Sequence, residues 1–239
     1  MKACSFDASM KARIKRALRK HANVTDEYCA INGEYVAWVI VSDGVPDVCV
    51  LATIAHKLDG KTMALFAKPE ETRLAALKYV PRYLELTRQG GARGLKGIAF
   101  VIDQEADSLD NLKGSVQKAL KEVAVKLEEE EGGTVPARLW KYRATWGSEA
   151  FSFVVAVNGL GERDRNHTIE DHLLSALKIE DSDDDPKRKW DSLRNRQNEA
   201  FDLIGEKPEL YCPQQYYALK ALERSKRAKR SKRLIRRLT

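Results

Sequence analysis

Short apolar runs bounded by Gly, Pro and acidic residues recur along the chain, and their length is typical of buried strands. They alternate with stretches whose apolar residues recur every three or four positions, as in amphipathic helices. The predicted strands are 35–41, 61–68, 98–102, 137–144 and 150–157. The predicted helices are 8–21, 48–58, 69–88, 109–131, 168–178, 188–205 and 213–238. This order predicts an α/β fold with a mainly parallel, Rossmann-like sheet, helices on both faces and a helical C-terminal extension.

Local signals set the limits of two helices and of the domains. Pro81 should kink or divide the helix predicted at 69–88, because a helix-interior proline removes a hydrogen bond and clashes with the preceding turn. Ser108 is a candidate N-cap for the helix that follows it. Residues 180–187 (EDSDDDPK) have the composition of a solvated linker. The predicted domains are a basic N-terminal helix at 1–25, an α/β domain at 26–180 and a helical extension with a basic tail at 181–239.

Charge is distributed unevenly along the chain. The formal net charge is +7, yet residues 224–237 alone hold nine Lys or Arg and no acid. No apolar run approaches the ~18–20 residues of a membrane span, so we expect a cytoplasmic protein without a membrane partner. The four cysteines are far apart and form no C-x-x-C pair, which favours free thiols in a reducing compartment.

Acidic residues follow the strongest predicted strand at alternate positions. Asp103, Glu105 and Asp107 come directly after the apolar run 98–102. If this segment stays extended, all three carboxylates point to one side. Carboxylates in that arrangement suit a hard cation such as Mg²⁺ or Mn²⁺. For Asp107 the competing interpretation is that it complements the dipole of the next helix.

A second acidic pair, Asp43 and Asp47, follows the strand predicted at 35–41. Because the carboxyl ends of parallel strands meet at one edge of a sheet, both acidic groups are expected in the same crevice. Asp43 precedes Gly44, so ordinary turn chemistry is the alternative explanation for it.

These motifs resemble those of the Toprim (topoisomerase–primase) family, in which a first strand ends in Glu-Gly and a later one in Asp-x-Asp. The stretch 39–51 (VIVSDGVPDVCVL) is similar to the first element, and 101–107 (VIDQEAD) to the second, near sixty residues later. Asp43 stands in place of the family's glutamate, and Glu105 in place of its second aspartate. Residues 153–159 and 168–174 are also similar to an uncharacterised archaeal branch of Toprim-related proteins, in which a Glu-Asp pair opens a helix.

The resemblance implies metal-dependent chemistry on nucleic acid. Asp103 and Glu105 would hold Mg²⁺ or Mn²⁺. Asp47 and Asp107 would support the metal shell directly or through water, and Asp43 would act as general acid or base or as a further ligand. Glu170 and Asp171 are either neighbours of the site or part of a helix cap that begins at Thr168.

The basic tail predicts a nucleic-acid partner, because clustered Lys and Arg bind phosphates with release of counterions. The residues predicted to bind are Arg224, Lys226, Arg227, Lys229, Arg230, Lys232 and Arg233. An acidic protein partner, the chain's own acidic body or a solvated end are the alternatives. The sequence thus predicts nuclease-like phosphodiester chemistry, with a non-catalytic nucleic-acid-binding protein and a degenerate Toprim site as the alternative. Turnover, other partners and oligomeric state are left open.

Overall fold

A computed structural model defines the fold for most of the chain. The residues that it describes are 1–18, 31–42, 45–58, 60–130, 136–160, 167–179 and 185–225. Asp43 and residues 226–239 of the basic tail lie outside these ranges.

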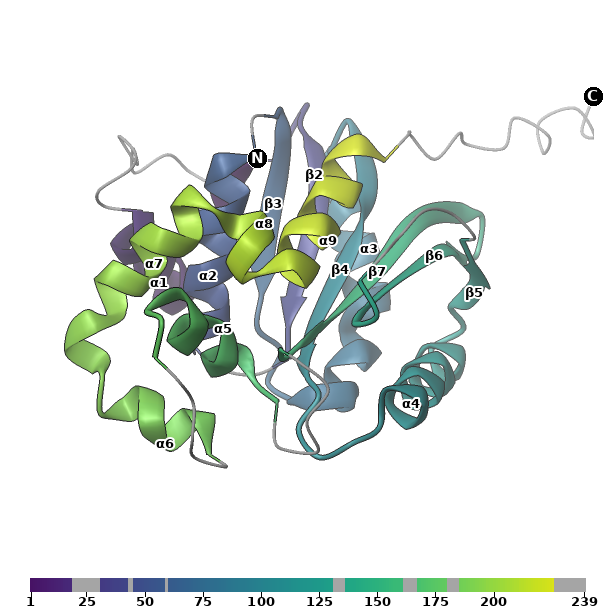
Figure 1. Cartoon of the computed structure of the whole chain (residues 1–239). Coiled ribbons are helices and arrows are strands. Elements are labelled where there is room, and N and C mark those ends of the chain that lie inside the picture. The colour runs from purple at the N-terminus through teal and green to yellow at the C-terminus, as the bar shows by residue number, and fades with distance from the viewer. Residues whose placement is uncertain are drawn as a thin grey trace, which may run out of the picture.

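Seven strands of the described residues form one mixed sheet (Figure 1). They are β1 (Lys2–Cys4), β2 (Tyr35–Val41), β3 (Thr62–Ala67), β4 (Gly94–Asp103), β5 (Lys126–Glu129), β6 (Leu139–Trp146) and β7 (Glu149–Asn158). Their order across the sheet is β1-β3-β2-β4-β7-β6-β5. Neighbours from β1 to β7 are parallel, whereas β6 is antiparallel to both β7 and β5. The predicted α/β fold with a mainly parallel sheet is therefore confirmed.

Helices cover both faces of this sheet (Figure 1). One face carries α1 (Ala8–Leu18), α2 (Val45–Lys57), α5 (Ile169–Ala176), α6 (Pro186–Asp191), the 3₁₀ turn η2 (Arg194–Arg196), α7 (Gln197–Glu206), α8 (Pro208–Tyr211) and α9 (Pro213–Arg224). The other face carries the 3₁₀ helix η1 (Arg73–Tyr79), α3 (Val80–Gln89) and α4 (Leu109–Glu122).

The central strand β2 shows why two cores form. Alternate side chains of a strand point to opposite faces of its sheet. Val39 and Val41 are buried among α1, α2 and α9, whereas Trp38 and Ile40 are buried among η1, α3 and α4. Since both faces are covered, β2 reads as a continuous apolar run, as parallel strands usually do.

Several local predictions are confirmed. The strand at 35–41 has the predicted limits. Pro81 divides the predicted helix, because η1 ends at Tyr79 and α3 begins at Val80 with the proline in its first turn. Ser108 caps α4, and its Oγ accepts a hydrogen bond from the Asn111 N–H at 3.2 Å.

Other local predictions are wrong. The helix predicted at 109–131 is too long. Residues 126–129 form the strand β5 instead, because the chain turns at Ala124 (φ 59°) and then pairs with β6. The helix predicted at 188–205 is divided into α6, η2 and α7. Lys187 belongs to α6 rather than to a linker, because Asp185 Oδ1 accepts hydrogen bonds from the backbone N–H groups of Lys187 and Arg188 and caps that helix.

Cysteine usage is only partly as expected. Cys49 and Cys212 are free and buried, and burial raises the pKa of the Cys49 thiol to about 11. Cys4 is in a disulfide bond, so the expectation of four free thiols is wrong. Within the described part of the chain, no helix has the length and apolar character that a membrane span requires.

Candidate functional site

The path of the chain creates a crevice at the carboxyl ends of β2 and β4. After β2 the chain moves outward to β3, and it then returns past β2 to place β4 on the opposite side. The helix after β2, α2, packs on one face of the sheet, and the helix after β4, α4, packs on the other. Ligands of open α/β sheets bind at such a switch point. The topology therefore places the acids that follow these strands where a ligand is favoured.

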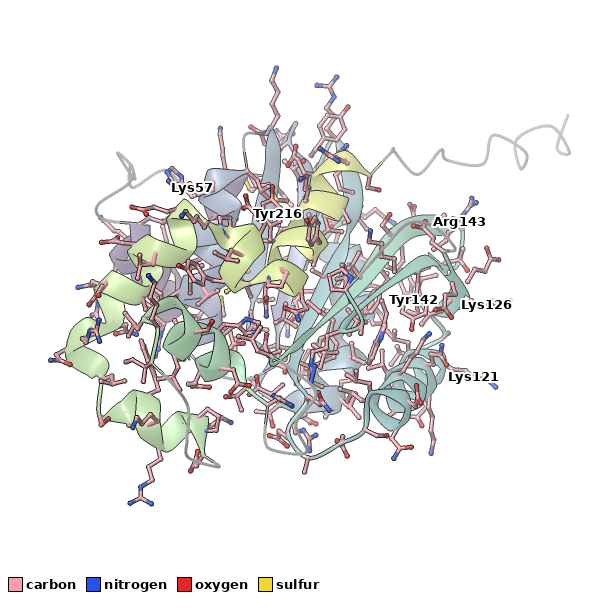
Figure 2. The ribbon with its side chains drawn as sticks, in the orientation of Figure 1. Lys57, Lys121, Lys126, Tyr142, Arg143 and Tyr216 are labelled. Carbon is pink, nitrogen blue, oxygen red and sulfur yellow. The ribbon has the colours of Figure 1, made fainter. Side chains whose placement is uncertain are left out.

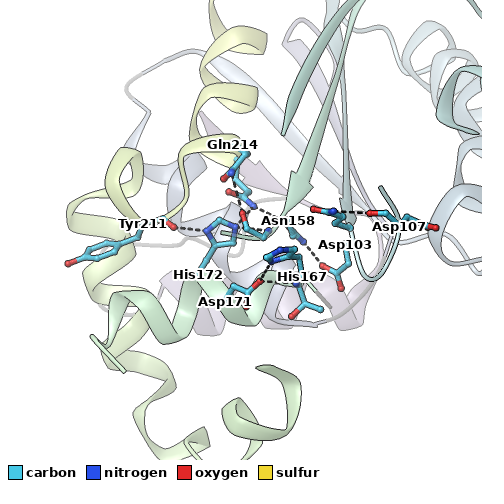
Figure 3. A network of polar contacts seen from close by, with 12 residues as sticks. Asp103, Asp107, Asn158, His167, Asp171, His172, Tyr211 and Gln214 are labelled. Atoms are coloured by element: carbon cyan, nitrogen blue, oxygen red, sulfur yellow. Dashed lines mark hydrogen bonds and ion pairs between the residues drawn. The ribbon is translucent and has the colours of Figure 1, made fainter. Parts of the chain in front are cut away.

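Asp47 and Asp103 converge on one amide group at this crevice. Asp103 is the last residue of β4 and Asp47 is in the first turn of α2, and both are only 2% exposed. Asn158, the last residue of β7, lies beside Asp103 in the parallel register. Its Nδ2 donates hydrogen bonds to Asp47 Oδ1 at 2.7 Å and Asp103 Oδ1 at 2.8 Å (Figure 3). Two carboxylates from separate strand ends thus share one donor.

Gln215 in α9 fixes the orientation of that amide. Its Nε2 donates a hydrogen bond to Asn158 Oδ1 at 2.5 Å, and the Gln215 side chain is fully buried. Since ionised carboxylates only accept hydrogen bonds, the nitrogen of Asn158 must face the two acids and its oxygen must face Gln215. A residue of the C-terminal extension therefore holds the strand-end site in place.

His172 adds a neutral imidazole to the same network. Its Nδ1 donates to the Tyr211 carbonyl oxygen at 2.7 Å, and its Nε2 accepts from the Gly159 N–H at 3.2 Å (Figure 3). Only a neutral ring protonated on Nδ1 satisfies both contacts. Burial lowers the pKa of His172 from its usual 6.5 to about 4, so this form persists at neutral pH. The hydrogen bond from the Gly159 N–H to His172 requires glycine at this position. Gly159 has φ 129°, and a Cβ there would lie 2.4 Å from the Cβ of His167.

Asp171 and Glu170 open α5 at the same edge. Asp171 Oδ2 accepts a hydrogen bond from the Thr168 N–H at 3.2 Å and lies 3.0 Å from His167 Nδ1. The hydrogen bond from the Thr168 N–H agrees with the interpretation of Asp171 as part of a helix cap. Glu170 is 7% exposed, and among the described residues its Oε2 has no hydrogen-bond partner. The interpretation of Glu170 as a neighbour of the site stays a prediction.

Glu105 and Asp107 point elsewhere than expected. Glu105 has φ 54° and pairs through its backbone with His167, so the segment after β4 turns instead of staying extended. Arg73 forms ion pairs with Glu105 Oε2 at 3.1 Å and with Asp107 Oδ2 at 2.8 Å. The expectation that Asp103, Glu105 and Asp107 point to one side is therefore wrong: Asp103 faces Asn158, and the other two face Arg73 near the surface.

Lys187 brings a positive charge to Asp103 from the outside. Its Nζ lies 3.5 Å from Asp103 Oδ2, and its side chain is half exposed. It also lines a cavity of about 300 Å³ together with Glu105, Ala106, Thr168, Asp185 and Pro186. The oxygen of Asp103 turned away from Asn158 thus meets a cation that solvent can reach.

The donor set fits a hard cation in part. Mg²⁺ prefers oxygen ligands and typically takes one or two carboxylates while keeping several waters. Asp47 and Asp103 supply such oxygens. Within the described ranges, no group of three or more His, Cys, Asp or Glu side chains could hold a metal ion. The residues present therefore fit a cation held by two carboxylates, and the general acid or base predicted at Asp43 lies outside the described residues.

Several residues of this network were missed as functional candidates. The DPK sequence at 185–187 carries a recognisable helix-start signal, an N-cap aspartate followed by proline, which would have placed Lys187 in the first turn of a helix. No local signal identifies Gln215, because its role depends on α9 packing against the end of β7. Comparison of the chain with family models, with curated proteins and with solved structures finds no match in any of the three.

Proposed function

We propose that this chain is a Toprim-like protein that binds Mg²⁺ or Mn²⁺ at Asp47 and Asp103 and acts on the phosphodiester bonds of nucleic acid. The convergence of Asp47 and Asp103 on the Asn158 amide, at the switch point of the sheet, carries the proposal. Two buried carboxylates this close repel each other unless cations or donors compensate them. Asn158 supplies a donor on one side, and a divalent cation would compensate the charge on the other.

Each neighbouring side chain has a defined part in this proposal. A bound ion would polarise a phosphoryl oxygen and stabilise the departing charge. Asn158 and Gln215 hold the two carboxylates in fixed orientations. Lys187 neutralises Asp103 when no ion is bound, and its exposed ammonium faces the cavity where a substrate phosphate would enter. Asp43 would exchange the proton with substrate or water.

Metal binding provides the first test. Titration of Mn²⁺ followed by electron paramagnetic resonance should show binding to the wild type and at least a ~10-fold weaker affinity for Asp103→Asn and Asp47→Asn. Asp107→Asn should lose less, because that carboxylate faces Arg73. Asp110→Asn, an exposed acid in the first turn of α4, is the matched control. Wild-type protein that binds no Mn²⁺ at millimolar concentration, or Asp103→Asn that binds like wild type, would refute the metal site.

Cleavage provides the second test. Single- and double-stranded DNA and RNA are incubated with the wild type and with Asp103→Asn in Mg²⁺ and in Mn²⁺. Metal-dependent cleavage that disappears in Asp103→Asn would support the proposal. Cleavage that survives this substitution would come from a contaminant.

A non-catalytic nucleic-acid-binding protein with a degenerate site is the second candidate. Its support is that Arg73 neutralises Glu105 and Asp107, and that Lys187 partly neutralises Asp103. This candidate predicts nucleic-acid binding that is equal in wild type and Asp103→Asn, with no cleavage by either.

A further inference from the structure

The C-terminal helix ends at the edge of the sheet opposite to the acidic crevice. Ser225, which follows α9, accepts a hydrogen bond on its carbonyl oxygen from Lys96 Nζ at 2.7 Å, and its Oγ lies 2.9 Å from Ser152 Oγ. Lys96 and Ser152 belong to the first halves of β4 and β7. Asp103 ends β4 seven residues after Lys96, roughly 23 Å away along a strand. The basic tail therefore begins at the amino edge, far from Asp103.

Close packing fixes α9 at this place. A Cβ at Gly97 would lie 2.3 Å from the Ser152 carbonyl oxygen and 2.7 Å from Leu222 Cδ2, so only glycine lets the helix approach β4 and β7 this closely. Leu222 is fully buried in the core beneath the helix. The starting point of the tail is thus set by the core of the protein.

Cations gather on an aromatic ring beside this point. The Arg93 guanidinium lies 4.8 Å and the Lys96 ammonium 5.2 Å from the centroid of the Tyr35 ring. Arg93 is exposed, and Tyr35 begins β2 at the same edge. The quadrupole of the ring attracts both cations and holds them beside Tyr35, with Arg93 exposed and Lys96 half-buried.

Two further arginines belong to this edge, Arg224 next to Ser225 in the chain and Arg143 in the register of Ser152. Arg224, the last residue of α9, is exposed. Arg143 of β6 (labelled in Figure 2) is exposed as well and lies opposite Ser152 in the antiparallel register, although Glu128 of β5 lies on its other side. We refer to Tyr35, Arg93, Lys96, Arg143 and Arg224 as the amino-edge surface.

Two acids at this edge are paired with cations, and two others, Glu128 and Glu223, neighbour Arg143 and Arg224. Glu149 pairs with Arg88 at 3.5 Å and Glu34 with Lys2 at 4.0 Å. In the sequence, eight further Lys or Arg follow Arg224 in residues 226–237, so this end of the chain carries a strong positive charge.

We propose that the amino-edge surface is the docking surface for a nucleic-acid backbone. This proposal rests on the proposed function, which supplies the nucleic-acid partner. It adds the residues that would bind the backbone, and these lie apart from the metal site. The exposed Arg93, Arg143 and Arg224, with the half-buried Lys96, suit phosphates, because such contacts are independent of sequence. The strand to be processed would dock at one edge and reach Asp103 at the other.

Fluorescence anisotropy with a labelled single-stranded RNA, measured over a series of salt concentrations, tests this surface. The variant Arg93→Gln/Lys96→Gln/Arg224→Gln is compared with Lys118→Gln/Arg188→Gln/Lys207→Gln, which removes the same charge from exposed positions on α4, on α6 and after α7. We expect the first variant to bind about tenfold more weakly, with a salt dependence reduced by about 2 in slope, and the second to bind almost like wild type. Mn²⁺ affinity should be unchanged in both.

Each other outcome has a defined meaning. Equal losses in the two triple variants would overturn the docking surface and leave only a general charge effect. Wild-type protein that binds RNA while the amino-edge variant binds equally well would also overturn it, without touching the proposed function. Wild-type protein that binds neither RNA nor DNA would refute both this surface and the nucleic-acid part of the proposed function.

Discussion

The two edges of the sheet use polar side chains in opposite ways. At the carboxyl edge, Asp47, Asp103, Asn158 and His172 are at most 2% exposed and contact one another or the backbone. At the amino edge, Arg93, Arg143 and Arg224 are exposed, and Arg93 lies over the Tyr35 ring. The carboxyl edge is therefore built for fixed geometry, and the amino edge for a diffuse positive potential.

This difference has a physical origin. A buried carboxylate is stable only with donors or cations in defined positions, so each member of the carboxyl-edge network limits where the others can lie. An exposed guanidinium keeps its hydration and tolerates many arrangements of a phosphate partner. Substitutions at the carboxyl edge should therefore affect folding stability, whereas substitutions at the amino edge should affect binding and its salt dependence.

Asn158→Leu should give the largest effect. It removes the donor shared by Asp47 and Asp103 and leaves Gln215 facing an apolar group, so the free energy of unfolding should fall by about 4 kcal/mol. Ser152→Ala, in the other half of the same strand, should cost less than about 1 kcal/mol, because its hydroxyl contact is only partly buried. Urea denaturation of both variants measures the difference. Equal losses would contradict the contrast between the edges.

Acid should weaken the carboxyl edge through His172. Burial lowers the pKa of this imidazole to about 4, whereas in the unfolded chain it is near 6.5, so the unfolded state takes up a proton first as the pH falls. The contribution to stability is complete above pH 6.5 and declines by about 3 kcal/mol as the pH approaches 4. Urea denaturation between neutral pH and pH 4 should show this decline in the wild type.

One variant separates His172 from other titrating groups. His172→Gln should reduce the slope of stability against pH between 6.5 and 4, whatever its stability at neutral pH. A wild-type slope in His172→Gln would show that the pKa of this imidazole is not lowered in the folded state.

Much of the fold could be predicted because its signals are local. The apolar run of β2, the proline that begins α3 and the serine that caps α4 each act within a few residues. The strand β5 could not be predicted, because its KLEE sequence favours helix and its strand conformation depends on pairing with β6. The three-residue β1 depends in the same way on β3.

The site was only partly predictable for a related reason. The convergence of Asp47 and Asp103 follows from parallel strands, whose ends meet at one edge. Glu105 was misplaced because its positive φ reverses the side-chain alternation on which the expectation depended. Gln215 reaches Asn158 from 57 residues further along the chain, and no sequence pattern records that contact.

Lys187→Met should give the smallest effect and sharpen the comparison most. The ammonium of Lys187 lies 3.5 Å from Asp103 Oδ2 on a half-exposed side chain, so it resembles the amino-edge cations in exposure although it lies at the carboxyl edge. Its removal should raise the affinity for Mn²⁺ by about threefold at low ionic strength, because an exposed ion pair is worth up to about 1 kcal/mol and competes with the metal. Added salt should reduce the difference, since screening weakens exposed pairs. Arg188→Met, the exposed neighbour on the same helix, should leave the affinity unchanged. Weaker Mn²⁺ binding by Lys187→Met would instead mean that the lysine organises the metal site, and the carboxyl edge would then depend on an exposed cation as well as on its buried network.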